Sequence, residues 1–152
     1  GLPVHFLLIG QAMDQEPMRS LAAASPYRDN IHLIGFRENV LGIVAACDVA
    51  VLPAVKREGL PKTVIEAMVH RVTPVVTPTG GNAELVEDGV SGLVVPPGNA
   101  AALAGAIERL YRNPEENRRM GEAARLRIGQ NFRLEDSVTA HLRLYEALTG
   151  KN

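Results

Sequence analysis

Cysteine and aromatic residues are scarce in this sequence. It has one cysteine, no tryptophan, three tyrosines and three phenylalanines. The single cysteine, Cys47, excludes an internal disulfide framework and a cysteine-rich zinc site. The four histidines are scattered without the spacing of metal ligands, so we expect no metal site. The scarcity of cysteine is consistent with a reducing, cytoplasmic compartment.

An excess of charge of either sign is also absent. Sixteen Lys and Arg face seventeen Asp and Glu, for a formal net charge of −1. Domains that bind nucleic acid need a basic footprint, so we expect no nucleic-acid partner. No apolar run approaches the ~18–20 residues that span a bilayer. Residues 1–4 contain no Met and do not resemble a signal peptide, and we expect the chain to be a piece of a longer protein.

Short apolar runs alternate with longer helical patterns along the 152 residues. This alternation predicts one α/β domain of Rossmann type, with three layers and a mostly parallel sheet. Runs so short and continuously apolar are typical of strands buried on both faces. The expected strands are 4–9, 31–34, 49–52, 75–77 and 93–95. The expected helices are 15–24, 39–46, 61–69, 83–87, 100–111, 114–130 and 134–148.

Several residues are expected at the ends of these elements. Asn82 and Asn99 are predicted to cap the helices that follow them, and Pro61 to occupy a first helical position. Charges that alternate in sign over 109–127 predict a solvated helix face. Ligands of parallel α/β sheets bind beyond the carboxyl ends of the strands. The loops 10–14, 35–38, 53–60 and 78–81 are therefore the places to look for a site.

The loop over 53–60 and the helix after it are the most informative. Glu58 lies in the loop, and Glu66 in the second turn of the helix. Gly59 allows a close backbone approach. The free N–H groups expected at Lys62, Thr63 and Val64 would make the helix start an anion site suited to phosphate. A carboxylate at Glu66 could accept hydrogen bonds from sugar hydroxyls, although Lys62 and Glu66 are also spaced as a simple surface ion pair.

Two other loops carry weaker patterns, each with a structural alternative. Gly80 and Gly81 precede a helix and could let a ligand approach the backbone, or could form a plain tight turn. Gly35, Phe36 and Arg37 follow the second strand and could face a nucleobase. Alternatively, Phe36 is a core residue and Arg37 a surface charge.

From 58 to 68 the sequence resembles the retaining glycosyltransferases of family 4, also called group 1, which have the GT-B fold. Glu58 and Glu66 match the family's E-x7-E motif. The resemblance covers nearly the whole chain, because other family patterns follow in register. They are found at 4–10, 31–36, 47–53, 75–81, 84–86, 89 and 92–96.

The resemblance implies a donor-binding, C-terminal GT-B domain. Such enzymes transfer a sugar from a nucleoside diphosphate sugar with retention and without a required metal, so no resident cofactor is expected. Glu58 would act as the catalytic residue against the donor sugar, and Glu66 would hold the ribose. Gly35, Phe36 and Arg37 would border the base. The backbone groups near the diphosphate or sugar would be those of Gly59, Leu60, Thr63, Gly80 and Gly81.

The sequence departs from the family at several points. Ala54 replaces the usual Ser, and Arg71 replaces a helix-capping Gly; a left-handed Arg there costs about 1 kcal/mol. The resemblance also implies that the acceptor-binding domain and the first strand of this domain are missing. That strand is the central one in the 3-2-1-4-5-6 order. We expect altered pairing, a strand-swapped homo-oligomer or further residues to close the gap.

Three functions remain open on the sequence. The first is a fragment of a glycosyltransferase that is inactive alone. Its whole protein is expected in the cytoplasm, peripheral at the inner membrane face. The second is a non-catalytic or regulatory module that binds nucleotide sugars, since fold does not fix function. The third is another enzyme on the same fold, such as a nucleotide-sugar epimerase, for which the acid and base residues are not evident.

Overall fold

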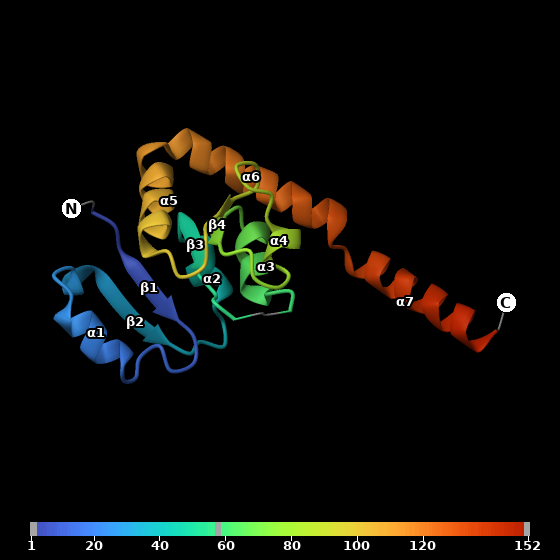
Figure 1. The fold of residues 1–152 in the computed structure, drawn as a ribbon, viewed down its shortest axis with the longest axis horizontal. Coiled ribbons are helices and arrows are strands. Elements are labelled where there is room, and N and C mark those ends of the chain that lie inside the picture. The colour runs from blue at the N-terminus through green and yellow to red at the C-terminus, as the bar shows by residue number, and fades with distance from the viewer. Residues whose placement is uncertain (1–2, 57–58, 151–152) are drawn as a thin grey trace. The chain divides into compact units, whose positions relative to one another are not determined.

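The computed structural model describes residues 3–56 and 59–150 (Figure 1). The chain forms two compact units, one up to Val40 and one from Leu41 onward. The first unit contains β1 (Phe6–Ile9), α1 (Met18–Ala24), a 3-10 turn (Arg28–Asn30) and β2 (Ile31–Gly35). The second contains α2 (Leu41–Ala45), β3 (Val49–Leu52), α3 (Lys62–Val69), β4 (Thr73–Val76), α4 (Asn82–Leu85), β5 (Leu93–Val94), α5 (Ala100–Arg112), α6 (Pro114–Asn131) and α7 (Leu134–Thr149).

Among the described residues the strands form two parallel sheets and not one. β1 pairs with β2, and the second sheet has the order β3-β4-β5. Both pairings are ones that the 3-2-1-4-5-6 order predicts among strands other than the first. The expected α/β architecture with parallel strands is confirmed, and the described strands form two sheets where one was expected.

The strands of the first unit are only partly covered. Phe6 and Leu7 on β1 keep 41% and 40% of their surface exposed. The expectation of strands buried on both faces is wrong here, because α1 is the one α-helix among the residues of this unit that the structure describes. His5 Nδ1 and His32 Nε2 share a hydrogen bond of 3.0 Å, and both residues are exposed.

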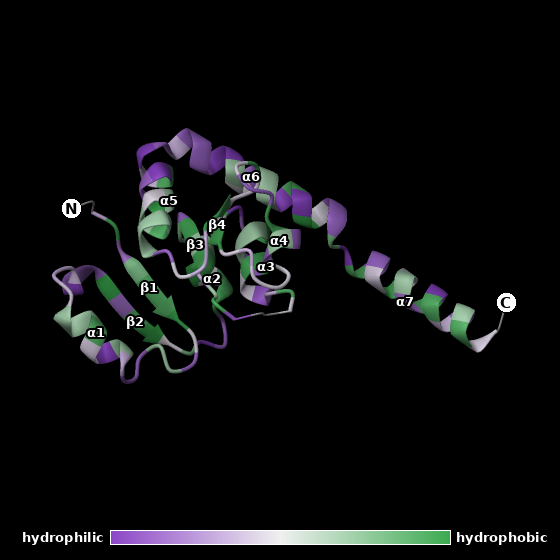
Figure 2. Ribbon diagram, in the orientation of Figure 1, coloured by the Kyte–Doolittle hydropathy of each residue, from purple (hydrophilic) through white to green (hydrophobic). Residues whose placement is uncertain are grey.

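The core of the second unit is built on β4, whose four residues are all buried. Successive strand residues point to opposite faces. Val76 faces a cluster under α3 and α6 that contains Val64, Met68, Leu85, Val86, Ala124 and Ile128. Val75 faces a cluster under α5 and α6 that contains Leu93, Val95, Ala106, Leu110 and Met120. Figure 2 shows the strands as mostly hydrophobic and α6 as mostly hydrophilic.

β4 begins earlier than predicted and includes Pro74. Proline lacks the N–H that a ladder needs and is confined to places where that donor is not required. β4 pairs with β5 only from Val75 onward, so no β5 partner lies opposite Pro74. Gly92 instead packs there, close enough that a Cβ on it would lie 2.5 Å from the Pro74 carbonyl oxygen.

The helix ends follow their sequence signals with two corrections. The Asn99 side chain accepts a hydrogen bond of 3.0 Å from the backbone N–H of Ala102, which confirms the predicted cap of α5. Pro61 is the N-cap of α3 and not its first helical residue. Gly81, and not Asn82, is the N-cap of α4, so the cap predicted at Asn82 is wrong.

The end of α3 contacts α6 through Arg71, Gly121 and Glu122, and we call this contact the α3–α6 joint. Arg71 has φ +63°, so the left-handed conformation expected at this position is present without a glycine. The N–H of Arg71 donates to Met68 and that of Val72 to Ala67, which is the Schellman pattern. Gly121 of α6 lies against the Arg71 carbonyl, and Arg71 Nε donates to Glu122 over 3.0 Å.

All of α7 is exposed, and its larger apolar residues have no cover within the described chain. Tyr145 keeps 62% of its surface exposed and Leu148 74%. Within residues 3–56 and 59–150, no helix has both the length and the apolar character that a membrane crossing requires.

Candidate functional site

The start of α3 leaves two of the three predicted N–H groups without an acceptor in the helix. The N–H groups of Val64 and Ile65 both donate to the Pro61 carbonyl, over 3.1 and 3.3 Å. The predicted free donor at Val64 is therefore wrong, because Pro61 as N-cap places its carbonyl one turn below. Lys62 and Thr63 remain the two residues whose N–H groups have no acceptor within the helix. Both are exposed, at the positive end of the helix dipole.

Glu66 lies one turn into α3 with a partly buried carboxylate. Its side chain is 19% exposed, and Lys62 Nζ lies 3.5 Å from Glu66 Oε1. The i,i+4 ion pair weighed as a structural alternative is therefore present. The Lys62 side chain is 87% exposed, and such pairs contribute roughly 0–1 kcal/mol. Glu58, the predicted catalytic residue, lies outside the described residues.

Two of the predicted loops meet in a glycine junction, formed by Gly59, Leu60, Gly80 and Gly81. The N–H of Gly81 donates to the Gly59 carbonyl over 3.1 Å. A Cβ on Gly81 would lie 2.8 Å from that oxygen and 3.0 Å from the Leu60 Cα. Gly80 has φ +57°, a left-handed conformation that glycine adopts without strain. The structure thus brings together four of the predicted donor-binding residues.

Two threonines, Thr77 and Thr79, hold the loop before the glycine junction, and the sequence did not predict their role. Thr77 Oγ1 donates to the Ala54 carbonyl over 2.6 Å, and Thr79 Oγ1 donates to the same oxygen over 3.3 Å. The N–H of Thr77 donates to Leu52 over 3.4 Å. These bonds tie the end of β4 to the end of β3. They use only the backbone of Ala54, so the missing serine hydroxyl there does not break them.

The residues expected to border a base lie in the first unit. Gly35 has φ +70°, and a Cβ on it would lie 2.7 Å from the carboxylate of Asp14. The N–H of Gly10 donates to the Gly35 carbonyl over 3.0 Å, so the ends of β1 and β2 are joined. Phe36 is 65% exposed, so the core alternative for it is wrong. Arg37 Nη1 donates to the Phe36 carbonyl over 2.8 Å.

Within the described residues, no group of three or more His, Cys, Asp or Glu is placed to hold a metal ion. The groups that the described site offers are backbone donors at a helix start, a carboxylate one turn on, and two loops whose glycines approach closely. Backbone N–H groups at a helix start favour phosphate, and a carboxylate favours hydroxyls.

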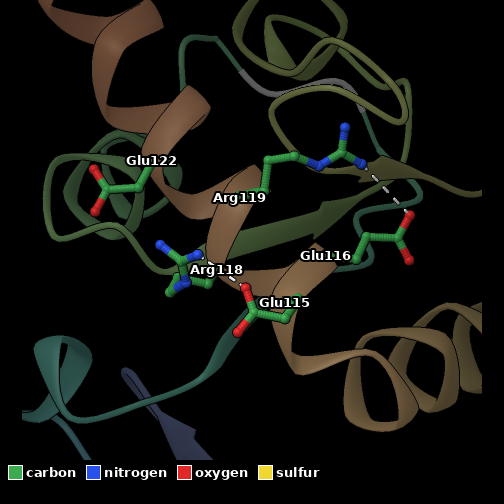
Figure 3. A pocket seen from close by; sticks show the side chains of 5 residues that line it. All are labelled: Glu115, Glu116, Arg118, Arg119 and Glu122. Atoms are coloured by element: carbon green, nitrogen blue, oxygen red, sulfur yellow. Dashed lines mark hydrogen bonds and ion pairs between the residues drawn. The ribbon is translucent and has the colours of Figure 1, made fainter.

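A hollow of about 470 Å³ lies elsewhere on the second unit, over the first turns of α6. Figure 3 shows that charged side chains line it, with Arg118 turned toward Glu115 and Arg119 toward Glu116. The hydrogen bond from Arg109 holds the pKa of Glu116 below its usual range. This is the solvated, alternating helix face that the sequence predicts, and it is formed by one helix only.

Cys47 is expected to react slowly with an alkylating reagent. Its thiol is partly buried and donates to the Ile43 carbonyl, and burial, with the charge of Asp48 second, raises the pKa of the thiol. A raised pKa means less thiolate at neutral pH, and thiolate is the reactive form. We expect iodoacetamide to modify the native chain more slowly than the urea-unfolded chain at neutral pH, with the native rate rising toward alkaline pH. Equal rates in the two states would contradict this environment for Cys47.

Sequence comparison gives relatives that share most of this chain. A family model described as "Glycosyl transferases group 1" matches residues 2–127. An alpha-D-kanosaminyltransferase of Streptomyces kanamyceticus is 32% identical, over 82% of this chain and 32% of its own length. A glycogen synthase of Alkalilimnicola ehrlichii is 29% identical, over 100% of this chain and 32% of its own length. The chain thus spans about a third of the length of these relatives.

Solved structures with a similar fold also come from larger proteins. Anabaena Alr3699/HepE in complex with UDP has a TM-score of 0.83 and 25% identity, over 98% of this chain and 42% of its own. The same protein has also been solved in complex with UDP-glucose. A sucrose-phosphate synthase of Thermosynechococcus elongatus has a TM-score of 0.84 and 26% identity, over 96% of this chain and 39% of its own.

Proposed function

Because the chain belongs to the group 1 glycosyl transferases, we propose that it is the donor-binding part of a glycosyltransferase that uses a nucleoside diphosphate sugar. The observation that carries this proposal is the glycine junction at the start of α3. It lies beyond the carboxyl ends of β3 and β4, the edge at which parallel α/β sheets bind ligands. The UDP and UDP-glucose complexes of the Anabaena neighbour support this ligand class.

The role of each residue follows from its chemistry. The diphosphate is placed at the start of α3, against the N–H groups of Lys62 and Thr63 and the backbone of the glycine junction. The Glu66 carboxylate accepts hydrogen bonds from the ribose hydroxyls. That Phe36 and Arg37 border the base is what the family resemblance implies, and Phe36 is exposed at the end of β2.

The catalytic part of the proposal rests on the resemblance at the E-x7-E spacing. Glu58 contacts the donor sugar, and transfer proceeds with retention at the anomeric carbon and without a required metal. By the same resemblance, the acceptor is bound by another domain of the whole protein. The family's first strand and helix of this domain carry an Arg and a Lys that hold the diphosphate, and no residues of these 152 match them. We therefore expect the chain alone to bind the donor but to transfer sugar negligibly.

We place the whole protein in the cytoplasm, with peripheral contact at the inner membrane face.

Replacement of Glu66 by Ala is expected to weaken nucleoside diphosphate binding by roughly 10- to 100-fold. Hydrogen bonds to a charged group contribute about 1.5–3 kcal/mol, which corresponds to that range. The measurement is a titration of the chain with UDP, GDP, ADP and NAD, followed by thermal shift or NMR. One of the three diphosphates should bind selectively, and NAD should not compete with it.

Glu122→Ala is the matched control, because this glutamate also forms an ion pair with a basic residue but lies on α6, outside the proposed site. It should leave nucleotide affinity unchanged. If the wild-type chain binds none of the three diphosphates, the proposed donor site is wrong. If Glu66→Ala binds as tightly as the wild type, the role assigned to Glu66 is wrong.

A further inference from the structure

Among the described residues, two asparagines have buried side-chain atoms without a hydrogen-bond partner: Asn117 lacks one at Oδ1 only, and Asn82 lacks one at both polar atoms. Its exposed fraction is 0%, and neither Nδ2 nor Oδ1 has a hydrogen-bond partner. The other fully buried polar side chains are partnered. Thr73 donates to the Asn117 carbonyl, Thr77 donates to the Ala54 carbonyl, and the Ser91 hydroxyl accepts from the N–H of Glu87.

The local fold does not account for this carboxamide. Asn82 is the first residue of α4 and does not act as its cap. Leu85, the last residue of α4, and Val86, the residue after it, belong to the apolar core. Buried polar groups left unpaired are disfavoured, and each one in a native structure calls for an explanation. A leucine of similar volume would suit this position better if folding alone mattered.

The position of Asn82 supplies a reason, because its backbone is fixed to the proposed donor site. Its N–H donates to the Thr79 carbonyl over 3.3 Å, and Gly81, the residue before it, donates to Gly59 over 3.1 Å. A shift of the turn at 79–81 relative to the start of α3 therefore also moves the Cα of Asn82, whose carboxamide is unpaired.

We propose that Asn82 is a positioning residue for the donor nucleotide, whose carboxamide completes its hydrogen bonds only when a nucleoside diphosphate occupies the glycine junction. The ligand-free chain holds the unpaired group at the expense of stability, and binding relieves it. The Asn82 carboxamide therefore lowers the stability of the ligand-free chain and raises its affinity for the nucleotide. The inference rests on the proposed function and adds to it a residue whose effect is exerted through the turn.

The test is Asn82→Leu, which keeps the volume and removes the polar atoms. The unfolding equilibrium constant without nucleotide should fall by about 5-fold or more, the benefit of removing a buried unpaired group. The dissociation constant for the diphosphate that the wild-type chain binds, among UDP, GDP and ADP, should rise by about 10-fold, the effect of one or two lost hydrogen bonds. Stability is measured by urea denaturation and affinity by calorimetric titration.

Thr73→Val is the matched control, because it removes a buried hydroxyl that already has a partner, at the α6 side of β4. It should lower stability and leave nucleotide affinity unchanged, the reverse of the pattern expected for Asn82→Leu. Should the leucine variant fail to fold, Asn82→Ala gives the affinity arm, since alanine fits any space that asparagine fills.

The outcomes separate the two proposals. A wild-type chain that binds no nucleoside diphosphate overturns the donor site, and with it the role of Asn82. A wild-type chain that binds, with an Asn82→Leu variant of equal affinity, overturns the role of Asn82 alone; a buried water that satisfies the carboxamide would give this result. Higher stability together with weaker binding supports the inference.

Discussion

Gly81→Ala is expected to weaken nucleoside diphosphate binding by roughly 10- to 100-fold, the effect of losing a hydrogen bond of about 1.5–3 kcal/mol to a charged phosphate. Gly81 has φ −74°, which alanine adopts without strain, so the backbone conformation tolerates the change. The space does not, because the new Cβ would lie 2.8 Å from the Gly59 carbonyl oxygen and 3.0 Å from the Leu60 Cα. Both are backbone atoms, so the start of α3 and the turn at 80–81 must separate.

The measurement is a titration of the variant with the diphosphate that the wild-type chain binds. Gly42→Ala is the control, because a Cβ on this glycine of α2 meets no atom within 4 Å. It should bind as the wild type does. A Gly81→Ala variant with wild-type affinity would show that the glycine junction does not form the ligand site, whatever the effect on stability.

Gly121→Ala is expected to lower the free energy of unfolding by about 2–4 kcal/mol, a large effect for one methyl group. A Cβ on Gly121 would lie 2.1 Å from the Arg71 carbonyl oxygen and 3.0 Å from its carbon. α6 must then move away from the end of α3. That movement disturbs Ala124 and Ile128, which fill the core on the same helix. Urea denaturation followed by circular dichroism measures the loss.

Gly129→Ala serves as the internal standard, because Gly129 lies on the same helix and a Cβ there meets nothing within 4 Å. It should raise the free energy of unfolding by about 0.5–1 kcal/mol, since glycine inside a helix is disfavoured by that amount relative to alanine. If the two variants are equally stable, the contact between α6 and Arg71 is not a close one.

Local sequence signals predicted most of the elements and some of their ends. The period of the apolar residues located β3 at its observed bounds, and the cap at Asn99 defined the start of α5. The sequence predicts a strand over 75–77, after Pro74, because proline usually lies at a strand boundary, whereas β4 includes Pro74. Its tolerance inside β4 depends on β5 starting one residue later, which is a matter of register between distant segments.

The candidate site was also predicted only in part from local signals. Residue types predicted a helix start, a carboxylate and two glycine loops. The contact between Gly81 and Gly59 depends on the parallel pairing of β3 with β4, and no local pattern encodes it. The cap predicted at Asn82 is wrong, although asparagine before a helix is a common capping signal. Gly81 is the N-cap of α4, and Asn82 is the first helical residue with a fully buried side chain.

The α3–α6 joint has a consequence for how the sequence can diverge. Arg71 holds a left-handed conformation that is easier for glycine, while its side chain bonds to Glu122 and its carbonyl needs the bare backbone of Gly121. A drift of position 71 to glycine would relax the backbone and leave the glutamate without its partner. It would not release Gly121, because the carbonyl remains. Across descendants of this sequence, positions 71 and 122 should therefore vary together, while position 121 stays fixed.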